Sequence, residues 1–405
     1  MVKKIAIIIE RADIALGGAE RSMFEVADAL STLDLHVDLL AAKGRTDRRN
    51  TRVLCEDVPG KRVSLAVFGN ALQHHLAQTP YDIVHSALPF DFADLYQPRG
   101  GTYAESVLRN AASYSNSFIR CWKRTTAFIN LRRAELLRAE RRLCRGSEGP
   151  VIAALSRYVI EQLRKHYATD PARIVLTLNG VNVDSHVDSD AARRIRSRFT
   201  AHFGDKGIEK PVLYLFAAHN FRLKGLGPLI RAMQLTCGTR TEQPVGLVVV
   251  GAGTSDTYQR LAKRLGVEKR MLFLEAVGHI HDTLAAVDVG ILPTFYDPSS
   301  RFVLEVLAAG KPVITTRFNG ATDHFVDGRH GKVVDSPNNV SALADAIRHF
   351  ASAANIQKAS LAITEDDLRS RVSIRRVAQE ILYLYQSISD TRERHNPGNP
   401  QTPPR

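Results

Sequence analysis

The chain of 405 residues is poor in the features that mark disulfide scaffolds, zinc modules and membrane spans. Its four cysteines (Cys55, Cys121, Cys144 and Cys237) are widely separated and form no Cys-x-x-Cys or Cys/His cluster, so we expect neither a disulfide framework nor structural zinc. No apolar run approaches the roughly 20 residues that a transmembrane helix needs. The first residues, MVKKIAIIIERAD, lack the apolar core and cleavage site of a signal peptide. We therefore expect a cytoplasmic protein.

Acidic residues are also scarce: 42 Asp and Glu accompany 55 Lys and Arg, giving a net charge of +13. Such an excess favours an anionic substrate, a nucleic acid or an anionic membrane surface as partner. Residues 109–145 contain ten of the basic residues and the only tryptophan, Trp122, beside Phe118. We interpret this segment as a patch that binds the inner face of the plasma membrane, with a solvated helical hairpin as the alternative. Nucleic-acid binding is disfavoured because the basic residues do not alternate with stacking aromatics.

Short apolar runs alternate with helical patterns along the chain, which is typical of an α/β protein with doubly wound parallel sheets. The scheme of strand, glycine-containing loop and helix occurs in both halves, so we predict two Rossmann-like domains, residues 1–190 and 191–372. The expected strands are KKIAIIIE, HVDLLAA, RVSLAVF, YDIVHSAL, VIAALS, PVLYLFAAH, GLVVVGAG and MLFLEAV. An amphipathic helix is expected over 373–389, and the polar, Pro-containing tail 390–405 is expected to be disordered.

The most informative segment, ILPTFYDPSSRFVLEVLAAGKPVITTRFNGATD, covers residues 291–323. An apolar strand precedes a Pro/Ser loop, a helix opens near Ser299, and that helix ends at Gly310 before another strand. A helix N-terminus with exposed N–H groups suits a phosphate. Asp297 and Glu305, separated by seven residues, can both border such a pocket and accept hydrogen bonds from sugar hydroxyls. The alternative is a buried strand–helix–strand unit with Glu305 on a solvated face.

This segment resembles the signature of the retaining, nucleotide-sugar-dependent glycosyltransferases of family GT4, which have the GT-B fold of two Rossmann-like domains facing across a cleft. That signature has two acidic residues at this spacing, the second in a Leu-Glu-Ala-like helix, and then Gly-x-Pro-Val-Ile. Here Asp297 replaces the usual first Glu and Val306 the usual Ala. The resemblance extends from about residue 5 to residue 335 and is nearest to bacterial lipopolysaccharide-core glucosyltransferases. It implies that the final helix, 373–389, packs back onto the acceptor-binding first domain.

The resemblance also implies roles for the residues of a donor site. Glu305 would bind the ribose, and Asp297 would bind the sugar together with the backbone around the helix start. Lys224, in a loop after a strand, would stabilise the departing phosphate. The remaining donor-binding residues that we expect are Gly17, Gly18, Arg222, Val277, Ser299, Ser300, Arg301 and Phe302.

The acceptor side of the sequence departs from the family pattern. Many members have a functional His before a Gly in the first domain, and related core enzymes have an Asp near that place. Here LYQPRGG offers Arg99 and Gly100 instead. Asp94, His85 and Asp91 remain as catalytic candidates, although His85 could equally be a core histidine at a strand end.

The resemblance therefore implies an enzyme that transfers a hexose, with UDP-glucose as the first guess for the donor, to a glycan or glycolipid acceptor. Lipopolysaccharide or cell-envelope polysaccharide synthesis is the expected setting. Because GT-B enzymes generally use helix dipoles and cationic side chains where others use a metal, we expect neither a metal nor a cofactor. The alternatives are a GT-B sugar-nucleotide epimerase, which needs no acceptor, and a basic nucleic-acid-binding protein.

Overall fold

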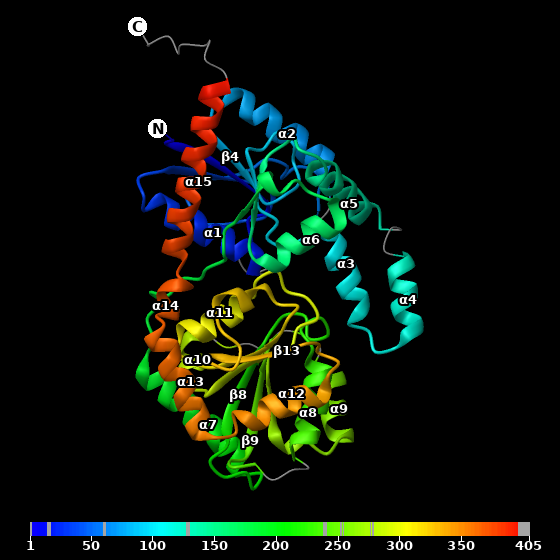
Figure 1. The fold of residues 1–405 in the computed structure, drawn as a ribbon, viewed down its shortest axis with the longest axis vertical. Coiled ribbons are helices and arrows are strands. Elements are labelled where there is room, and N and C mark those ends of the chain that lie inside the picture. Colours follow the sequence, from blue (N-terminus) through cyan, green and yellow to red (C-terminus); the bar gives the residue numbers. More distant parts are fainter. Residues whose placement is uncertain are drawn as a thin grey trace.

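The computed structural model describes residues 2–13, 18–59, 62–126, 130–237, 241–251, 253, 255–275, 277 and 279–395. In this part of the chain two lobes follow one another, each built on a parallel sheet with helices on its faces (Figure 1). The predicted fold class is confirmed: both sheets are doubly wound.

The N-terminal lobe has seven strands in the order β3-β2-β1-β4-β5-β6-β7, all paired in parallel. The order reverses between β1 and β4, which is where ligands bind in such sheets. Its strands are β1 (Lys4–Arg11), β2 (His36–Lys43), β3 (Thr51–Val53), β4 (Ile83–Ser86), β5 (Leu95–Tyr96), β6 (Val151–Ala154) and β7 (Ile174–Leu176). Its helices are α1 (Gly18–Ser31), α2 (Leu65–Gln78), α3 (Tyr103–Ala112), α4 (Ser117–Thr125), α5 (Leu131–Cys144) and α6 (Arg157–Tyr167).

One strand prediction, RVSLAVF, is wrong. Helix α2 begins inside this run, because Ser64 caps it by accepting a hydrogen bond from the Val67 N–H. The apolar residues of the run then face the core at helical spacing, with Phe68 and Leu72 buried. The third strand, β3, lies earlier in the chain.

The C-terminal lobe has six parallel strands in the order β10-β9-β8-β11-β12-β13. These are β8 (Val212–Ala217), β9 (Val245–Val250), β10 (Met271–Leu274), β11 (Val289–Leu292), β12 (Val313–Thr316) and β13 (Gly331–Val334). The helices of this lobe are α7 (Ser189–Gly204), α8 (Leu226–Cys237), α9 (Asp256–Arg264), α10 (Ile280–Ala285), α11 (Arg301–Ala308), α12 (Val340–His349), α13 (Ala353–Glu365) and α14 (Leu368–Arg371).

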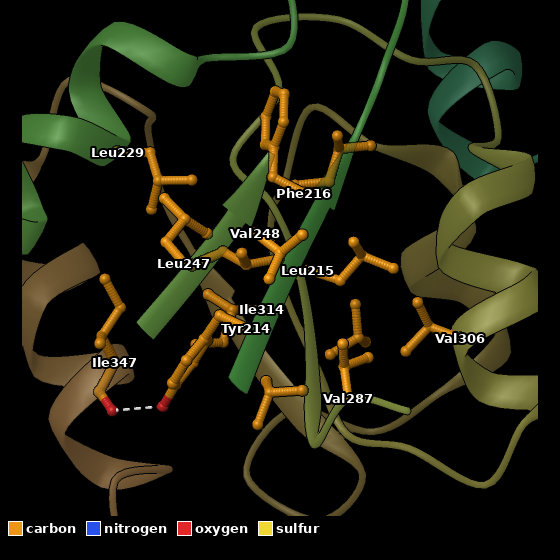
Figure 2. Close-up of a cluster of buried hydrophobic side chains, with 14 of the residues drawn as sticks. Tyr214, Leu215, Phe216, Leu229, Leu247, Val248, Val287, Val306, Ile314 and Ile347 are labelled. Carbon is orange, nitrogen blue, oxygen red and sulfur yellow. Dashed lines mark hydrogen bonds between the residues drawn. The ribbon is translucent and has the colours of Figure 1, made fainter. Parts of the chain in front are cut away.

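The core of the C-terminal lobe fixes the position of α11 (Figure 2). Val306 points from α11 toward the sheet, where a Cβ on Gly290 of β11 would lie 2.4 Å from a Val306 methyl group. The glycine therefore makes room for the valine that replaces the alanine usual in the family. On the other side of the sheet, Tyr214 satisfies its buried hydroxyl by donating to the Ile347 carbonyl at 2.7 Å.

Two chain segments cross between the lobes side by side. Backbone hydrogen bonds join the two segments. The Val181 N–H donates to the Val372 carbonyl, and the Ile374 N–H donates to the Val181 carbonyl, both at 2.8 Å. The predicted domain boundary at 190 falls in the first turn of α7, whose Phe199 and Phe203 belong to the C-terminal core.

Helix α15 (Ile374–His395) returns to the N-terminal lobe and packs on α1 (Figure 1). Val377, Ile381 and Tyr385 enter the core beneath it. The helix is longer than predicted: residues 390–395 are helical, so the expected disorder is wrong for them. Residues 396–405 of that tail lie outside the described residues.

Candidate functional site

Helix α11 begins where the two lobes meet. Ser300 caps the helix by accepting from the Val303 N–H, and its own N–H donates to Asn319 Oδ1 at 3.1 Å. Asp297 Oδ1 accepts from the Ser299 N–H. These bonds leave the first helical N–H groups, those of Arg301 and Phe302, without an acceptor among the described residues. The helix start can therefore bind an anion, as the sequence predicts.

Lys224 lies at this helix start, as predicted. It follows β8, and its Nζ donates to Asp297 Oδ2 at 2.5 Å and to the Tyr296 carbonyl at 3.3 Å. The next residue, Gly225, has φ +83°, and a Cβ there would stand 1.9 Å from the Pro293 carbonyl oxygen. Only glycine allows the two loops to approach so closely, which is how the ammonium group reaches Asp297.

Glu305 belongs to a cluster of alternating charges that joins the lobes. Arg301 makes two bonds of 2.8 Å to Glu25 of α1 and one of 3.3 Å to Glu305. Arg21 is bonded to Glu25 at 3.2 Å. Burial raises the pKa of Glu305, against the opposing effect of Arg301 and Arg21. The Glu305 carboxylate thus lies in the interlobe region and not on a solvated face.

The N-terminal lobe forms the opposite wall of the site. An ideal Cβ on Gly18, the first residue of α1, would lie 3.3 Å from the Arg301 side chain, so Gly18 lies beside the start of α11. Asn179 donates from Nδ2 to the Ser299 carbonyl at 3.1 Å, and Ser156 donates to the Pro298 carbonyl at 2.7 Å. Gly17 lies outside the described residues.

Arg99 is a buried cation at this wall. Its guanidinium donates to Gln97 Oε1 at 3.1 Å, to Asn179 Oδ1 at 2.8 Å and to Ser22 Oγ, all neutral acceptors. Its Nε is buried without a partner among the described residues. Burial and the nearby Arg301 lower the Arg99 pKa to about 9. A guanidinium held in this way favours the arrival of a negative charge.

Three other predicted residues, Gly100, Phe302 and Val277, have the following surroundings. The Gly100 carbonyl accepts from the Tyr296 hydroxyl at 3.1 Å, so the acceptor-side loop contacts the donor-side loop. The side chain of Phe302 is buried in the C-terminal core, which leaves only its backbone for the ligand. Val277 is half-buried against the same core.

Arg222 does not point to the donor site, and its prediction as a donor-binding residue is wrong. Its guanidinium crosses to the N-terminal lobe, donates to the Asn110 carbonyl at 3.0 Å and to Ser113 Oγ, and stacks 3.8 Å from the Tyr114 ring centre. Arg222 and Lys224 lie in one turn between β8 and α8, and within this turn their side chains reach different partners.

Asp94 and His85 are not placed for catalysis, and both predictions are wrong. Asp94 lies at the amino end of β5, where Oδ2 accepts from the Val84 N–H at 2.7 Å and Oδ1 pairs with Arg392 near the end of α15. His85 is fully buried, and its Nδ1 bonds to the Tyr385 hydroxyl at 2.7 Å. Burial lowers its pKa to about 3, so it is the core histidine that was the alternative interpretation.

Sequence analysis did not identify three residues of the site. Ser22 and Glu25 lie in α1 a few residues after Gly18, and Asn179 lies in the loop after β7. Only the packing of α1 and of this loop against α11 brings them to the site. Among the described residues, no group of three or more His, Cys, Asp or Glu could hold a metal ion. Independence of metal stays a prediction.

The basic segment 109–145 forms part of α3, then α4 and α5, and α4 stands out from the N-terminal lobe (Figure 1). None of the residues of α4 is buried; Phe118 is 78% exposed and Trp122 55%. No described helix is long and apolar enough to span a bilayer. The exposed aromatic side chains of α4 are what a surface-binding helix would present.

Comparison with known proteins agrees with this architecture. A family model described as "Glycosyltransferase Family 4" matches residues 16–185, and one described as "Glycosyl transferases group 1" matches residues 210–353. The lipopolysaccharide glucosyltransferase WaaG of Escherichia coli K12 is 24% identical over 82% of this chain and 85% of its own length. The D-inositol 3-phosphate glycosyltransferase of Corynebacterium glutamicum is 28% identical, but the match covers only 51% of each chain.

Solved structures share the whole fold. The crystal structure of WaaG superposes with a TM-score of 0.65 over 96% of this chain and 98% of its own, at 20% identity. The sucrose-phosphate synthase of Thermosynechococcus elongatus reaches 0.74 over 96% and 100%, at 18% identity. HepE of Anabaena, solved with UDP and glucose, reaches 0.67 over 95% and 100%, at 16% identity. Two matching family models, one in each lobe, and a shared two-lobed fold show that this chain belongs to the GT4 glycosyltransferases of the GT-B fold.

Proposed function

We propose that this glycosyltransferase retains the anomeric configuration and transfers a hexose, glucose from UDP-glucose being the first candidate, to a glycan or glycolipid of the cell envelope. The observation that carries the proposal is the meeting of Lys224, the α11 N-terminus and Glu305 at one interlobe site. The likeness to WaaG over most of both chains supports a lipopolysaccharide acceptor.

The charges of the site suit a nucleotide diphosphate. Lys224, Arg301, Arg99 and Arg21 bring four positive charges, whereas Asp297, Glu305 and Glu25 bring three negative ones. A diphosphate would therefore meet a net positive site next to free N–H groups.

Each part of the nucleotide sugar has a residue suited to bind it. The Lys224 ammonium has three N–H donors, two of which are used, and the third is available to the leaving phosphate. Glu305 Oε2 has no hydrogen-bond partner among the described residues and would accept from the ribose hydroxyls. The Asp297 carboxylate and the backbone at Ser299 to Phe302 would hold the sugar and the diphosphate, with Gly18 at the diphosphate and Val277 near the base.

The reaction then needs little from a protein base. The bond from the anomeric carbon to the phosphate oxygen breaks, and a bond from that carbon to the acceptor oxygen forms on the same face. The departing phosphate oxygen takes the acceptor proton. Lys224 and the helix dipole stabilise the charge that develops on the phosphate, so the protein requires no divalent cation for that step.

On the acceptor side, we assign to Arg99 and Gly100 the role of positioning the acceptor. Arg99 is held rigidly by three neutral partners, and Gly100 contacts the donor loop through Tyr296. Neither residue can act as a general base, because a guanidinium gives up its proton too reluctantly and glycine has no side chain. This agrees with proton transfer to the leaving phosphate.

We also propose that α4 attaches the enzyme to the inner face of the plasma membrane. Phe118 and Trp122 would enter the interface while Arg120, Lys123 and Arg124 face anionic headgroups, each cation contributing about 1 kcal/mol. Such attachment would bring a cytoplasmic enzyme to a glycolipid acceptor.

The transfer is tested by incubating the protein with UDP-glucose, with and without lipopolysaccharide core oligosaccharide. Acceptor-dependent release of UDP and a hexose added to the acceptor are expected. Conversion of UDP-glucose to another UDP-sugar without acceptor would instead show the epimerase. A salt-titrated binding assay with DNA and RNA separates the remaining alternative, which predicts tight binding at low salt.

A further inference from the structure

A second basic pocket lies outside the α11 site. It has a volume of about 570 Å³ and is formed where the tip of the α3–α4 hairpin comes down beside α8 and α9 (Figure 1). Its lining includes Ser113, Tyr114, Arg222, Arg231, Arg260 and Arg264. We call it the arginine pocket.

The charged side chains that line the arginine pocket are all positive. Four guanidinium groups line it, and none of its described lining residues is acidic. Arg231, Arg260 and Arg264 are exposed and make no ion pair with the described part of the chain. Four like charges around one cavity repel each other, and an anion between them would relieve that repulsion.

One of the four arginines is already held in place. Arg222 is fixed by the Asn110 carbonyl, by Ser113 Oγ and by stacking on the Tyr114 ring. A guanidinium ordered before binding loses less entropy when a ligand arrives. The hydroxyl groups of Thr257 and Tyr258, which also line the pocket, offer neutral donors.

This chemistry matches a phosphate group. Guanidinium groups bind phosphate oxygens through paired, charge-assisted hydrogen bonds, and several converging arginines satisfy more than one oxygen at once. A carboxylate offers fewer acceptor positions, and a neutral sugar leaves the charges uncompensated.

We propose that the arginine pocket binds a phosphate group of a ligand other than the sugar donor. Arg222 precedes Lys224 by two residues in one loop, so the bound phosphate would adjoin the donor site on the opposite side of that loop. The phosphate belongs either to a soluble phosphorylated molecule or to an anionic lipid headgroup beside α4. The proposal does not depend on the identity of the donor.

The test uses the full-length protein with Arg260→Gln/Arg264→Gln and a matched control, Arg193→Gln/Arg194→Gln. The control removes two equally charged, exposed arginines on α7, away from the pocket. All variants also carry Lys224→Gln, which weakens phosphate binding at the α11 site and leaves that site the same in the pocket variant and in the control. Thermal unfolding checks that each variant is folded.

Two arms distinguish the sources of phosphate. Calorimetric titration with inorganic pyrophosphate reports a soluble ligand, and sedimentation with phosphatidylglycerol vesicles, against phosphatidylcholine vesicles, reports a headgroup. We expect the pocket variant to bind at least about tenfold more weakly than the control in one arm or both. Equal binding by the pocket variant and the control in both arms would overturn the proposal, whatever the Lys224 substitution itself does to donor binding.

Discussion

Arg301, the first residue of α11 in the C-terminal lobe, forms a two-point ion pair with Glu25 of α1 in the N-terminal lobe, with both N–O distances at 2.8 Å. Both side chains are largely buried. Because Arg301 also contacts Glu305, the residue proposed to bind the ribose lies one side chain away from the contact that joins the lobes. Lobe closure and donor binding therefore share a residue.

We predict that Glu25→Gln loosens the lobes. The substitution keeps the shape of the side chain but removes the ion pair between Arg301 and residue 25, while the contact with Glu305 remains. We expect a loss of about 1–2 kcal/mol in the free energy of unfolding for this partly buried pair. Small-angle scattering should show a larger radius of gyration, which added nucleotide reduces. Glu380→Gln, which removes a surface pair within α15, is the control. An unchanged radius in Glu25→Gln would contradict this role.

Gly225→Ala should damage both stability and donor binding. Its φ is +83°, and the added Cβ would lie 1.9 Å from the Pro293 carbonyl oxygen, so the loop carrying Lys224 must shift. We expect a loss of about 2–4 kcal/mol in chemical denaturation. Gly227→Ala, where the nearest side-chain atom is 3.8 Å away, should be neutral or slightly stabilising. Equal effects at the two positions would argue against the close approach.

The two halves of the site differed in how far the sequence could predict them. Asp297, Lys224 and Glu305 follow local rules: each lies in or beside a strand, loop or helix whose pattern is visible in a short window, and the parallel sheet then gathers them at one edge. Arg222 was misplaced because two cations in one loop face opposite ways. Asp94 and His85 were misassigned because the burial that satisfies them comes from α15, some three hundred residues later.

The buried Glu140 predicts a pH dependence of stability. It accepts hydrogen bonds from the hydroxyls of Tyr96 and Tyr167 and from the Tyr103 N–H, yet burial raises its pKa to about 7. A carboxyl group whose pKa is higher in the folded than in the unfolded state stabilises the fold when the pH lies below the unfolded pKa. This contribution is lost as the pH rises toward the folded pKa of about 7.

Glu140→Gln removes this titration. The variant should gain stability relative to the wild type between pH 5 and 8, by about 3 kcal/mol at most, as a raised pKa of this size implies. Urea unfolding at several pH values measures the difference. If the free energies of unfolding of the two proteins changed equally with pH, Glu140 would not titrate in this range.

Removing the exposed aromatics of α4 should strongly weaken membrane binding. Phe118→Ser/Trp122→Ser keeps all basic residues but deletes the apolar contact, so sedimentation with phosphatidylglycerol vesicles at low salt should fall about tenfold or more. Tyr383→Ser on α15, where the side chain is 73% exposed, is the control. Absence of vesicle binding by the wild type at low salt would end the membrane proposal.

The most direct test of the donor site is nucleotide binding by Glu305→Gln. UDP, GDP, ADP and TDP are first screened by thermal shift, and the best nucleotide is then titrated calorimetrically into the wild type, Glu305→Gln and Glu380→Gln. Loss of charged hydrogen bonds to the ribose should weaken binding about tenfold to a hundredfold in Glu305→Gln alone. Equal nucleotide affinity in all three proteins would contradict a donor site built on α11.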